Sequence, residues 1–355
     1  MKHLSTISSA ALAIGTMLAP FSVSAEESNP LQFDFGNDGS LTFYGYLKAT
    51  YISDFDYDLG DTTKGLKSIG LPGGSPAGSH ERLHLKESRI GLNFRSSDVL
   101  VKLEGDFFGT KNDLNLRTRL AYVTWNGALI GQDWTNFMSV ENLGRNVDFQ
   151  GPAGLPFARL PQIKYTFGTP QNWSVSASIE EDVSNDSDHH YTVAARKGFD
   201  GGMFRVAGLY RDTVLGGTPV QGWGLSLGGT LNAWEGGKVS GLLTTGEGIS
   251  DILAFGLSGN AISVGGDEVG VVGFSLGVSQ KVSEKITLAA FTGYTNLDVA
   301  TGTDTKQLRT LHMSAFYDVA KNVELGLEYY IGRRKQGDGV SFEADRLLMS
   351  AKFTF

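Results

Sequence analysis

Two serine motifs are the parts of this sequence whose residue types and spacing could carry out chemistry. Residues 224–228 and 273–277 both read G-x-S-x-G, the pattern of a hydrolase nucleophile elbow. An elbow needs a strand, a sharp turn and a helix to expose its serine. Both motifs instead lie within runs that alternate apolar and polar residues, so Ser226 and Ser275 are predicted to be small strand residues. Hydrolysis is therefore the weaker hypothesis, and we expect no enzyme activity.

Metal chemistry is equally weak in the sequence. Asp54, Asp56 and Asp58 alternate like the start of a calcium loop, but Leu59 and Gly65 stand where that loop needs glycine and an acidic residue. A solvated acidic loop is expected, with divalent ions that bridge neighbouring lipopolysaccharide as the alternative. The six histidines show no three-ligand zinc spacing, and the chain has no cysteine, which excludes disulfides and thiolate sites. No cofactor is expected.

The N-terminus has the layout of an export signal. Lys2 precedes a short apolar run, Ala10 to Phe21, and Val23-Ser24-Ala25 forms an A-x-A-like cleavage site. The apolar run is too short for a transmembrane helix, which needs ~20 residues. We predict a secretory signal peptide over 1–25, cleaved after Ala25, a short periplasmic N-terminal segment over 26–40, and one large β domain over 41–355.

Composition and periodicity favour strands that cross a bilayer. The chain has 47 glycines, 9 prolines and 11% aromatic residues, which fits a chain of strands and turns. The net charge of -8 argues against nucleic acid as a partner. From Leu41 to Phe355 the dominant period is two, and apolar residues occupy one face of each run. About 16 strands of roughly ten residues are expected, the length that crosses a bilayer when tilted. They are 41–53, 83–95, 98–109, 114–126, 127–134, 159–168, 171–182, 188–198, 202–212, 220–232, 234–247, 270–281, 284–296, 306–319, 322–334 and 342–355.

The connections alternate between short turns and long loops, which is typical of an up-and-down barrel in an outer membrane. Aromatic residues cluster beside the short turns, where an interfacial girdle would lie; these are Phe94, Trp125, Phe167, Trp173, Phe199, Phe204, Trp234, Tyr317 and Phe355. Closure follows because an open strand edge in hydrocarbon would leave backbone groups without hydrogen bonds. The predicted fold class is all-β, a transmembrane up-and-down antiparallel β-barrel of about 16 strands, located in a bacterial outer membrane.

The region from Gly131 to Thr166 resembles the signature region of the DcaP-like porins, a family of trimeric outer-membrane channels. Three blocks match in order: GQ-x-W-x-N-F-M from Gly131, D-F-x-G-P from Asp148, and Q-I-K-Y-T from Gln162. Leu160 and Pro161 depart from the small or polar residues expected in the family, and residues 26–40 leave little room for the longer N-terminal extension of some relatives. The resemblance implies a 16-stranded homotrimer with one pore per subunit that passes small anionic solutes such as dicarboxylates.

The third long loop, about 135–158, follows the fifth strand and is expected to fold inward and narrow the lumen, because irregular backbone at membrane depth is tolerated where it lines a wet cavity. An external loop of no special role is the alternative. Strand parity places a basic set in the lumen about twice as large as the acidic set, which lowers the barrier for anions. The predicted pore and constriction residues are Arg89, Lys102, Arg117, Arg119, Asn136, Glu141, Arg145, Asp148, Arg159 and Lys164.

The predicted function is passive diffusion of small hydrophilic solutes with anion preference centred on Arg117 and Arg119. Three alternatives stay open: these arginines form a structural ion-pair network, the pore is non-selective or of the sugar type, or the barrel is a hydrolase or a plugged anchor. The predicted partners are outer-membrane lipid, lipopolysaccharide and small anionic solutes, besides two further copies of the chain.

Overall fold

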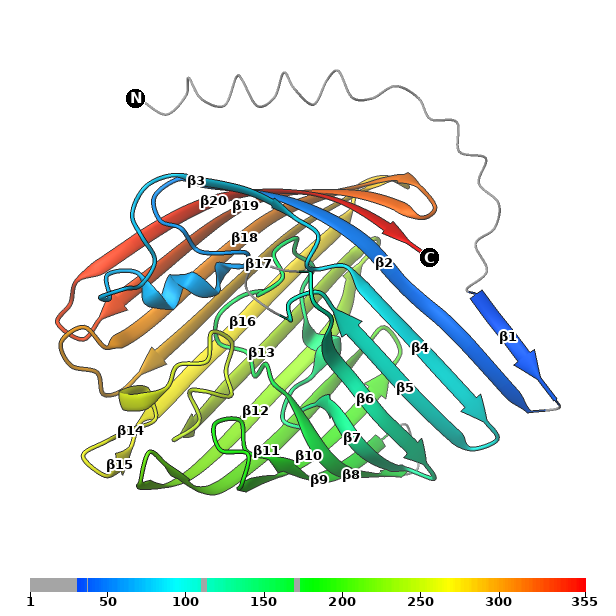
Figure 1. Ribbon diagram of the computed structural model, residues 1–355, viewed down its shortest axis with the longest axis horizontal. Coiled ribbons are helices and arrows are strands. Elements are labelled where there is room, and N and C mark those ends of the chain that lie inside the picture. Colours follow the sequence, from blue (N-terminus) through cyan, green and yellow to red (C-terminus); the bar gives the residue numbers. More distant parts are fainter. Residues whose placement is uncertain (1–30, 37, 110–113, 169–172) are drawn as a thin grey trace.

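A closed antiparallel β-barrel makes up most of the chain (Figure 1). The computed structural model describes residues 31–36, 38–109, 114–168 and 173–355. The predicted signal peptide, 1–25, and residues 26–30 lie outside this description. Within the described ranges, no helix is long and apolar enough to cross a membrane.

The wall consists of consecutive strands that pair with their neighbours in sequence, and the last strand pairs with the first wall strand to close it. The sheet counts 18 strands; β1 is an added hairpin arm, and β3 and β4 together form one wall strand, so 18 − 2 leaves the predicted 16. The bounds are β1 Leu31–Phe35, β2 Gly39–Asp54, β3 His80–His84, β4 Arg89–Ser96, β5 Val99–Asp106, β6 Arg117–Trp125, β7 Ala128–Trp134, β8 Arg159–Gly168, β9 Trp173–Glu181, β10 His189–Phe199, β11 Gly202–Leu215, β12 Thr218–Trp234, β13 Gly237–Glu247, β16 Gly270–Lys281, β17 Ile286–Leu297, β18 Thr305–Ala320, β19 Val323–Gln336 and β20 Ser341–Thr354.

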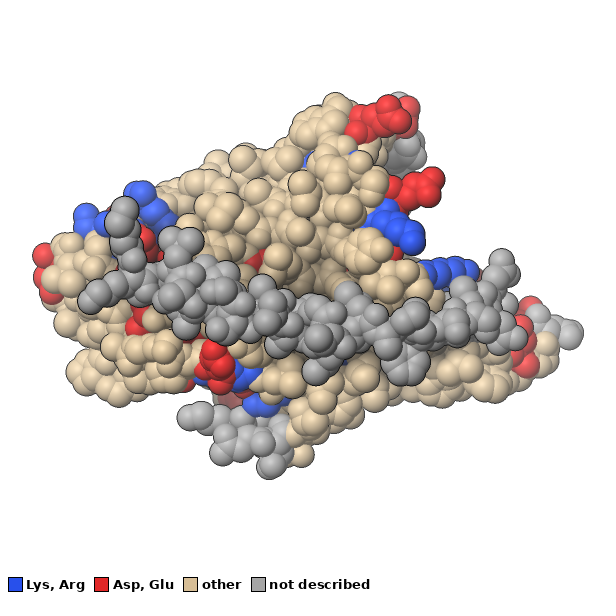
Figure 2. Space-filling view, turned by 90° about the horizontal axis from the view of Figure 1, so that it is seen from above, with Lys and Arg blue, Asp and Glu red and all other residues tan. Residues whose placement is uncertain are grey.

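The two faces of the wall differ as the period-two pattern predicts. Along β12, for example, the outward Trp223, Leu225 and Leu227 are exposed, whereas the intervening Gly224 and Ser226 are buried. Ser275 is likewise a buried residue of β16, so neither serine motif forms an elbow. Figure 2 shows one side of the molecule with most charged side chains toward its ends and uncharged residues across the middle. This apolar middle suits the hydrocarbon layer.

Tight turns join the strands at one end of the barrel. The turn between β6 and β7 is the two-residue pair Asn126-Gly127, with φ of 47° and 84°. Positive φ at both positions defines a type I′ hairpin, which explains why asparagine and glycine stand there. Except for Phe94, which is only partly exposed, the predicted girdle aromatics beside these turns are exposed. The aromatic belt at this end is therefore present.

The N-terminal arm β1 was not predicted. It pairs with β2 from Leu31↔Phe43 to Phe35↔Gly39, along the part of β2 that precedes its pairing with β20, which begins at Tyr46↔Thr354. The arm lies within the predicted N-terminal segment, 26–40, and β2 begins at Gly39, two residues before the predicted start. The backbone N–H and C=O groups of β1 find their hydrogen-bond partners on this part of β2. The sequence pattern of residues 31–35 alone does not show that these partners exist.

At the opposite end, three long connections pack together. They are 55–79, which contains η1 (Thr63–Ser68), 135–158, which contains η2 (Val140–Asn142), and 248–269, which contains η3 (Gly259–Ala261), β14 (Ser263–Val264) and β15 (Asp267–Glu268). Lys67 Nζ donates to Gly256 O at 2.6 Å, and Phe157 N donates to Ile252 O at 2.9 Å. Leu66 is fully buried among these loops. The barrel therefore has an apolar core at its long-loop end.

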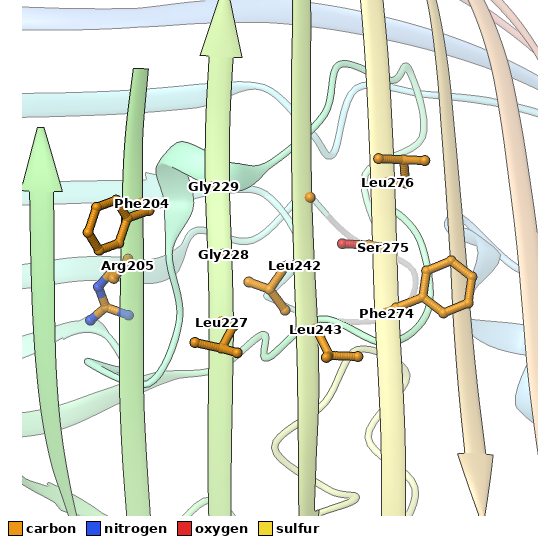
Figure 3. Close-up of a pocket in the computed structure, with 11 residues that line it drawn as sticks. Phe204, Arg205, Leu227, Gly228, Gly229, Leu242, Leu243, Phe274, Ser275 and Leu276 are labelled. Atoms are coloured by element: carbon orange, nitrogen blue, oxygen red, sulfur yellow. The ribbon is translucent and has the colours of Figure 1, made fainter. Parts of the chain in front are cut away.

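A shallow hollow of ≈ 500 Å³ lies in the wall at β11, β12, β13 and β16. It exists because two glycines, Gly229 and Gly241, face each other in register on neighbouring strands. Figure 3 shows the larger side chains that border it, among them Phe204, Leu243 and Leu276. Most of its lining is apolar, as expected of a surface beside hydrocarbon.

Candidate functional site

The 135–158 segment, hereafter the inner segment, leaves the wall after β7 and returns to it at β8. Thr135 N donates to Ala158 O at 3.0 Å, so departure and return lie side by side. Phe137 is fully buried and Met138 nearly so, which anchors the first turn of the segment in the apolar core. The GQ-x-W-x-N-F-M block therefore interrupts the strand pattern because the chain leaves the barrel wall here.

A buried carboxylate on β9 holds the start of the inner segment. Glu180 Oε1 accepts from Asn136 N at 2.7 Å and from Ser178 Oγ at 2.6 Å, while its Oε2 lies 3.0 Å from His190 Nε2. Glu180 and His190 are in register on β9 and β10, and both are fully buried. We call Ser178, Glu180 and His190 the β9 cluster.

A second cluster of the same composition holds the middle of the inner segment. Glu328 on β19 accepts from Val147 N, from Asp148 N at 3.3 Å and from Ser314 Oγ at 2.7 Å, and it lies 2.8 Å from His312 Nδ1. Ser314, Glu328 and His312 form the β19 cluster. In both clusters the carboxylate stands between serine and histidine, so the imidazole does not take the serine proton as a hydrolase triad requires.

The two clusters lie on opposite walls. Counting around the barrel with β3 and β4 as one strand, β9 is the seventh wall strand and β19 the fifteenth, eight of 16 apart. Between them the inner segment contacts β12, where Thr230 Oγ1 donates to Glu141 O at 2.8 Å. It then contacts β17, where Gly144 lies against the Phe291 ring. The contacts of this stretch therefore follow the wall from β9 round to β19, and Val147 O also accepts from Lys48 Nζ of β2 at 2.7 Å.

Close packing along this course requires glycine. A Cβ on Gly144 would lie 2.7 Å from the Phe291 ring, and one on Gly154 would lie 2.1 Å from Tyr294 O. Gly154 also has a φ of +87°, which L-residues with side chains rarely adopt. The glycines let the backbone of the inner segment lie directly on the wall.

The arginines of β6 are ion-paired with carboxylates of β5. Arg117 binds Asp106 with two hydrogen bonds, 2.9 Å from Nε and 2.7 Å from Nη2. Arg119 reaches Glu104 Oε1 at 3.0 Å and Asp106 Oδ2 at 2.8 Å, and Arg89 lies 3.5 Å from Glu104. The ion-pair network that the sequence left as an alternative is present.

Aromatic rings connect this network to the inner segment. The Phe149 ring lies 5.3 Å from Arg119 Cζ, and the Trp134 ring lies 5.9 Å from Arg119 Cζ and 5.1 Å from Arg159 Cζ. Arg159 forms no ion pair with a described residue, and its Nη1 has no hydrogen-bond partner among them. A cavity of ≈ 280 Å³ lies here, and Lys48, Arg89, Arg119, Trp134 and Phe149 are among its lining residues.

The other predicted site residues divide between the wall and the inner segment. Lys164 Nζ pairs with Asp133 at 2.9 Å, whereas Lys102 lies over the Tyr44 ring at 4.8 Å without an ion pair to a described residue. Arg145 pairs with Glu324 on β19. Lys164 and Arg145 are therefore ion-paired, whereas Lys102 contacts an aromatic ring.

The carboxylates of the two acidic residues of the inner segment, Glu141 and Asp148, both accept hydrogen bonds from other parts of the protein. Glu141 binds Arg196 of β10 at 2.6 and 2.7 Å, and these hydrogen bonds lower the pKa of the Glu141 carboxyl. Asp148 is buried and accepts from Thr63 Oγ1 at 2.7 Å; burial raises the pKa of its carboxyl. Asn136 O and Oδ1 accept from Arg205 of β11, which is not among the predicted site residues.

The described ranges contain no group of three or more His, Cys, Asp or Glu side chains that could hold a metal ion. The β9 and β19 clusters were missed because each is assembled across two strands. Glu180↔His190 and Ser314↔Glu328 are register partners, so a strand-pairing diagram built from the sequence could have found them.

Among solved structures, the chain is similar to the outer membrane channel DcaP of Acinetobacter baumannii. The TM-score is 0.81 at 22% sequence identity, over 91% of this chain and 99% of that chain. The chain has the DcaP-like porin fold. The resemblance first seen over Gly131 to Thr166 thus extends, as architecture, to nearly the whole described barrel.

Other porins share the DcaP-like fold at lower similarity. An anion-selective porin from Comamonas acidovorans matches with a TM-score of 0.62 at 14% identity, over 90% of this chain and 100% of that chain. The trimer form of OmpT, an outer membrane protein of Vibrio cholerae, matches with a TM-score of 0.60 at 16% identity, over 90% and 100% of the two chains. No protein-family model and no curated protein sequence matches the chain. At these identities the likeness establishes the fold alone.

Proposed function

We propose that this protein is a passive-diffusion porin of a bacterial outer membrane that prefers small anionic solutes, dicarboxylates above all, and assembles as a homotrimer. The apolar outer face of the barrel, the aromatic belt and the likeness to outer-membrane porins support the location. The trimer form of a similarly folded protein supports the assembly. No cofactor takes part, because the function is a polar path through an apolar layer.

The observation that carries the proposal is the charge balance around Trp134. Arg89, Arg117, Arg119 and Arg159 bring four positive charges, and Glu104 and Asp106 bring two negative ones, so 4 − 2 leaves +2. The inner segment adds no free carboxylate, since Glu141 is ion-paired and Asp148 is buried. In this proposal the inner segment lines one half of the lumen and the pore runs between it and the basic half.

Such a pore favours anions for two physical reasons. A net positive constriction lowers the electrostatic barrier for anions and raises it for cations. Guanidinium groups also match carboxylates with two parallel hydrogen bonds, which favours carboxylated solutes over spherical anions. Arg89, Arg117 and Arg119 share the two carboxylates Glu104 and Asp106, so one of the two surplus charges belongs to this network and the other to Arg159.

Reversal potentials in planar bilayers under a KCl gradient test the proposal. The Arg117→Ala/Arg119→Ala variant removes two charges and reduces the local balance from +2 to zero, so anion preference should fall to near none. Arg159→Ala leaves +1 and should reduce it by less. Lys321→Ala, in a short turn, is the matched control and should change nothing. Cation selectivity of the wild type, or an unchanged double variant, would overturn the proposal.

Two other functions have specific observations behind them. Most wall cations are neutralised in ion pairs, as expected of a non-selective or sugar-type porin, and succinate that fails to block the chloride current would favour that reading. The apolar core at the long-loop end is what a plugged anchor would show. Single-channel recording that finds no conductance would establish the anchor instead.

A further inference from the structure

The outward face of the barrel carries a basic patch at its long-loop end. Arg309 on β18 and Arg333 on β19 are register partners, and both side chains are exposed. Their parity is that of Met313 and Leu327, which are exposed apolar residues of the same two strands. The two guanidinium groups therefore project from the face that borders lipid.

A neighbouring register pair, nearer the long loops, adds a third cation. Lys335 on β19 is exposed and faces Gln307 in register, and Gln307 Nε2 donates to Tyr294 Oη at 2.9 Å. Arg309 Cζ also lies 5.4 Å from the Tyr294 ring. Arg309, Arg333 and Lys335 together form the outer basic patch.

Like charges that face each other directly across two strands repel, and this arrangement destabilises a sheet. Within the described part of the chain, no member of the outer basic patch forms an ion pair, although Glu343 is the register partner of Arg333. Asp345, two residues further along β20, accepts instead from Tyr329 Oη at 2.8 Å. The patch thus gathers three positive charges in neighbouring positions of two strands, with one exposed carboxylate, Glu343, beside them.

The position of the outer basic patch along the strands indicates which anionic group would balance its charge. Below the patch come Leu311↔Ile331 and then Met313↔Tyr329, which continue the apolar face toward the short turns. A ligand that fits both surfaces has an anionic head at the patch and apolar chains along the strands beneath it. Arginine and lysine bind phosphate oxygens through charge-assisted hydrogen bonds.

We propose that the outer basic patch binds the phosphate groups of a lipopolysaccharide molecule in the outer leaflet. The proposal rests on the outer-membrane location argued above, and it is independent of pore selectivity. Phosphate placed between Arg309 and Arg333 converts their mutual repulsion into two attractive contacts. The acyl chains then lie against β18 and β19.

Binding of diphosphoryl lipid A to the purified full-length protein in detergent micelles tests the site. The Arg309→Ala/Arg333→Ala variant should bind about 10- to 100-fold more weakly, the loss expected for charge-assisted hydrogen bonds. Arg309→Lys/Arg333→Lys should recover part of the affinity. Lys285→Ala/Lys321→Ala removes two charges from the turns at the opposite end, which contact neither register pair, and should bind like the wild type.

Three kinds of result would overturn the proposal, the second of which can be obtained in two ways. The first is equal binding of diphosphoryl lipid A by the wild type and the alanine variant. The second is competition by inorganic phosphate at matched concentration, which would assign the patch to a soluble anion; dephosphorylated lipid A that binds as tightly as the phosphorylated form would be equivalent evidence against phosphate recognition. The third is loss of the oligomer without loss of lipid binding, which would assign the face to a second copy. Reversal potentials of the same variants should stay unchanged, so failure here leaves the porin proposal standing.

Discussion

Removing one acceptor oxygen from Glu328 should release the middle of the inner segment from the wall. Four donors converge on this carboxylate: Val147 N, Asp148 N, Ser314 Oγ and His312 Nδ1. In Glu328→Gln, an NH₂ group replaces one oxygen. This group is a hydrogen-bond donor, so it faces one of the two backbone N–H donors, and that N–H loses its acceptor. The serine hydroxyl can rotate and the imidazole can change tautomer, but a backbone N–H cannot adapt.

The expected magnitude follows from that single loss. A buried donor left without an acceptor costs about 1–3 kcal/mol, which makes the released state about 5- to 150-fold more populated. The cost falls on the attachment of the segment and not on the wall, whose backbone ladder is unchanged. We therefore expect a folded barrel with a more mobile inner segment.

Two measurements check this expectation. Hydrogen exchange of the peptide over 143–150 should accelerate by the same factor, and single-channel current noise should rise. Glu343→Gln, on the outer rim of the neighbouring strand, is the matched control and should alter neither. Because the β9 cluster lies on the opposite wall, Glu180→Gln should accelerate exchange around 136 independently, and the two effects should add. Unchanged exchange and unchanged noise in Glu328→Gln would refute the role assigned to the β19 cluster.

Three further predictions concern the long-loop end and the inner segment. Gly154→Val should displace the segment from β17, because its Cβ would lie 2.1 Å from Tyr294 O; a conductance equal to that of the wild type would contradict this. Phe137→Ala should cost about 3–5 kcal/mol of local stability, measured as faster exchange around residues 135–138, since the ring is fully buried. Burial lowers the pKa of Lys67 from the ordinary 10.5 to about 8. Between these two pH values, Lys67 therefore binds more protons when segment 55–79 is released from Gly256 than when it is docked there. The docked state should become more stable as pH rises. Protease cleavage within 55–79 should therefore slow from pH 8 to pH 10 relative to Lys67→Met at each pH, and an identical pH course in both proteins would exclude the effect.

The strand architecture could be predicted because a wall between lipid and water imposes its polarity on every second residue. The predicted strands agree with the observed ones within a few residues, and the inward arginines of β6 follow from the same parity. The arm β1 could not be predicted in this way, since its partner is the part of β2 that β20 does not pair with, and strand parity does not reveal that edge.

Ion-pair partners required information that parity does not contain. Parity says that Arg117 and Asp106 point inward, but only the register of β5 and β6 makes them direct neighbours. The path of the inner segment depends on contacts with strands far away in sequence, such as Val147 with Glu328. Spacing within one strand therefore identifies candidates for the site, whereas tertiary register decides which of them remain available to a solute.

The unequal lining of the barrel has a mechanical consequence. From β9 round to β19 the wall is backed by a second layer, the inner segment, which buried carboxylates hold at its start and at its middle. Along β4 to β8 the segment meets the wall through ring contacts, such as that of Phe149 with Arg119, and β4 to β9 are strands of only 7 to 10 residues. Lateral compression will therefore bend this more weakly supported side first. Since the arginines of β4 and β6 stand on that compliant side, the stiffness of the barrel and the placement of its charge are properties of the same strands.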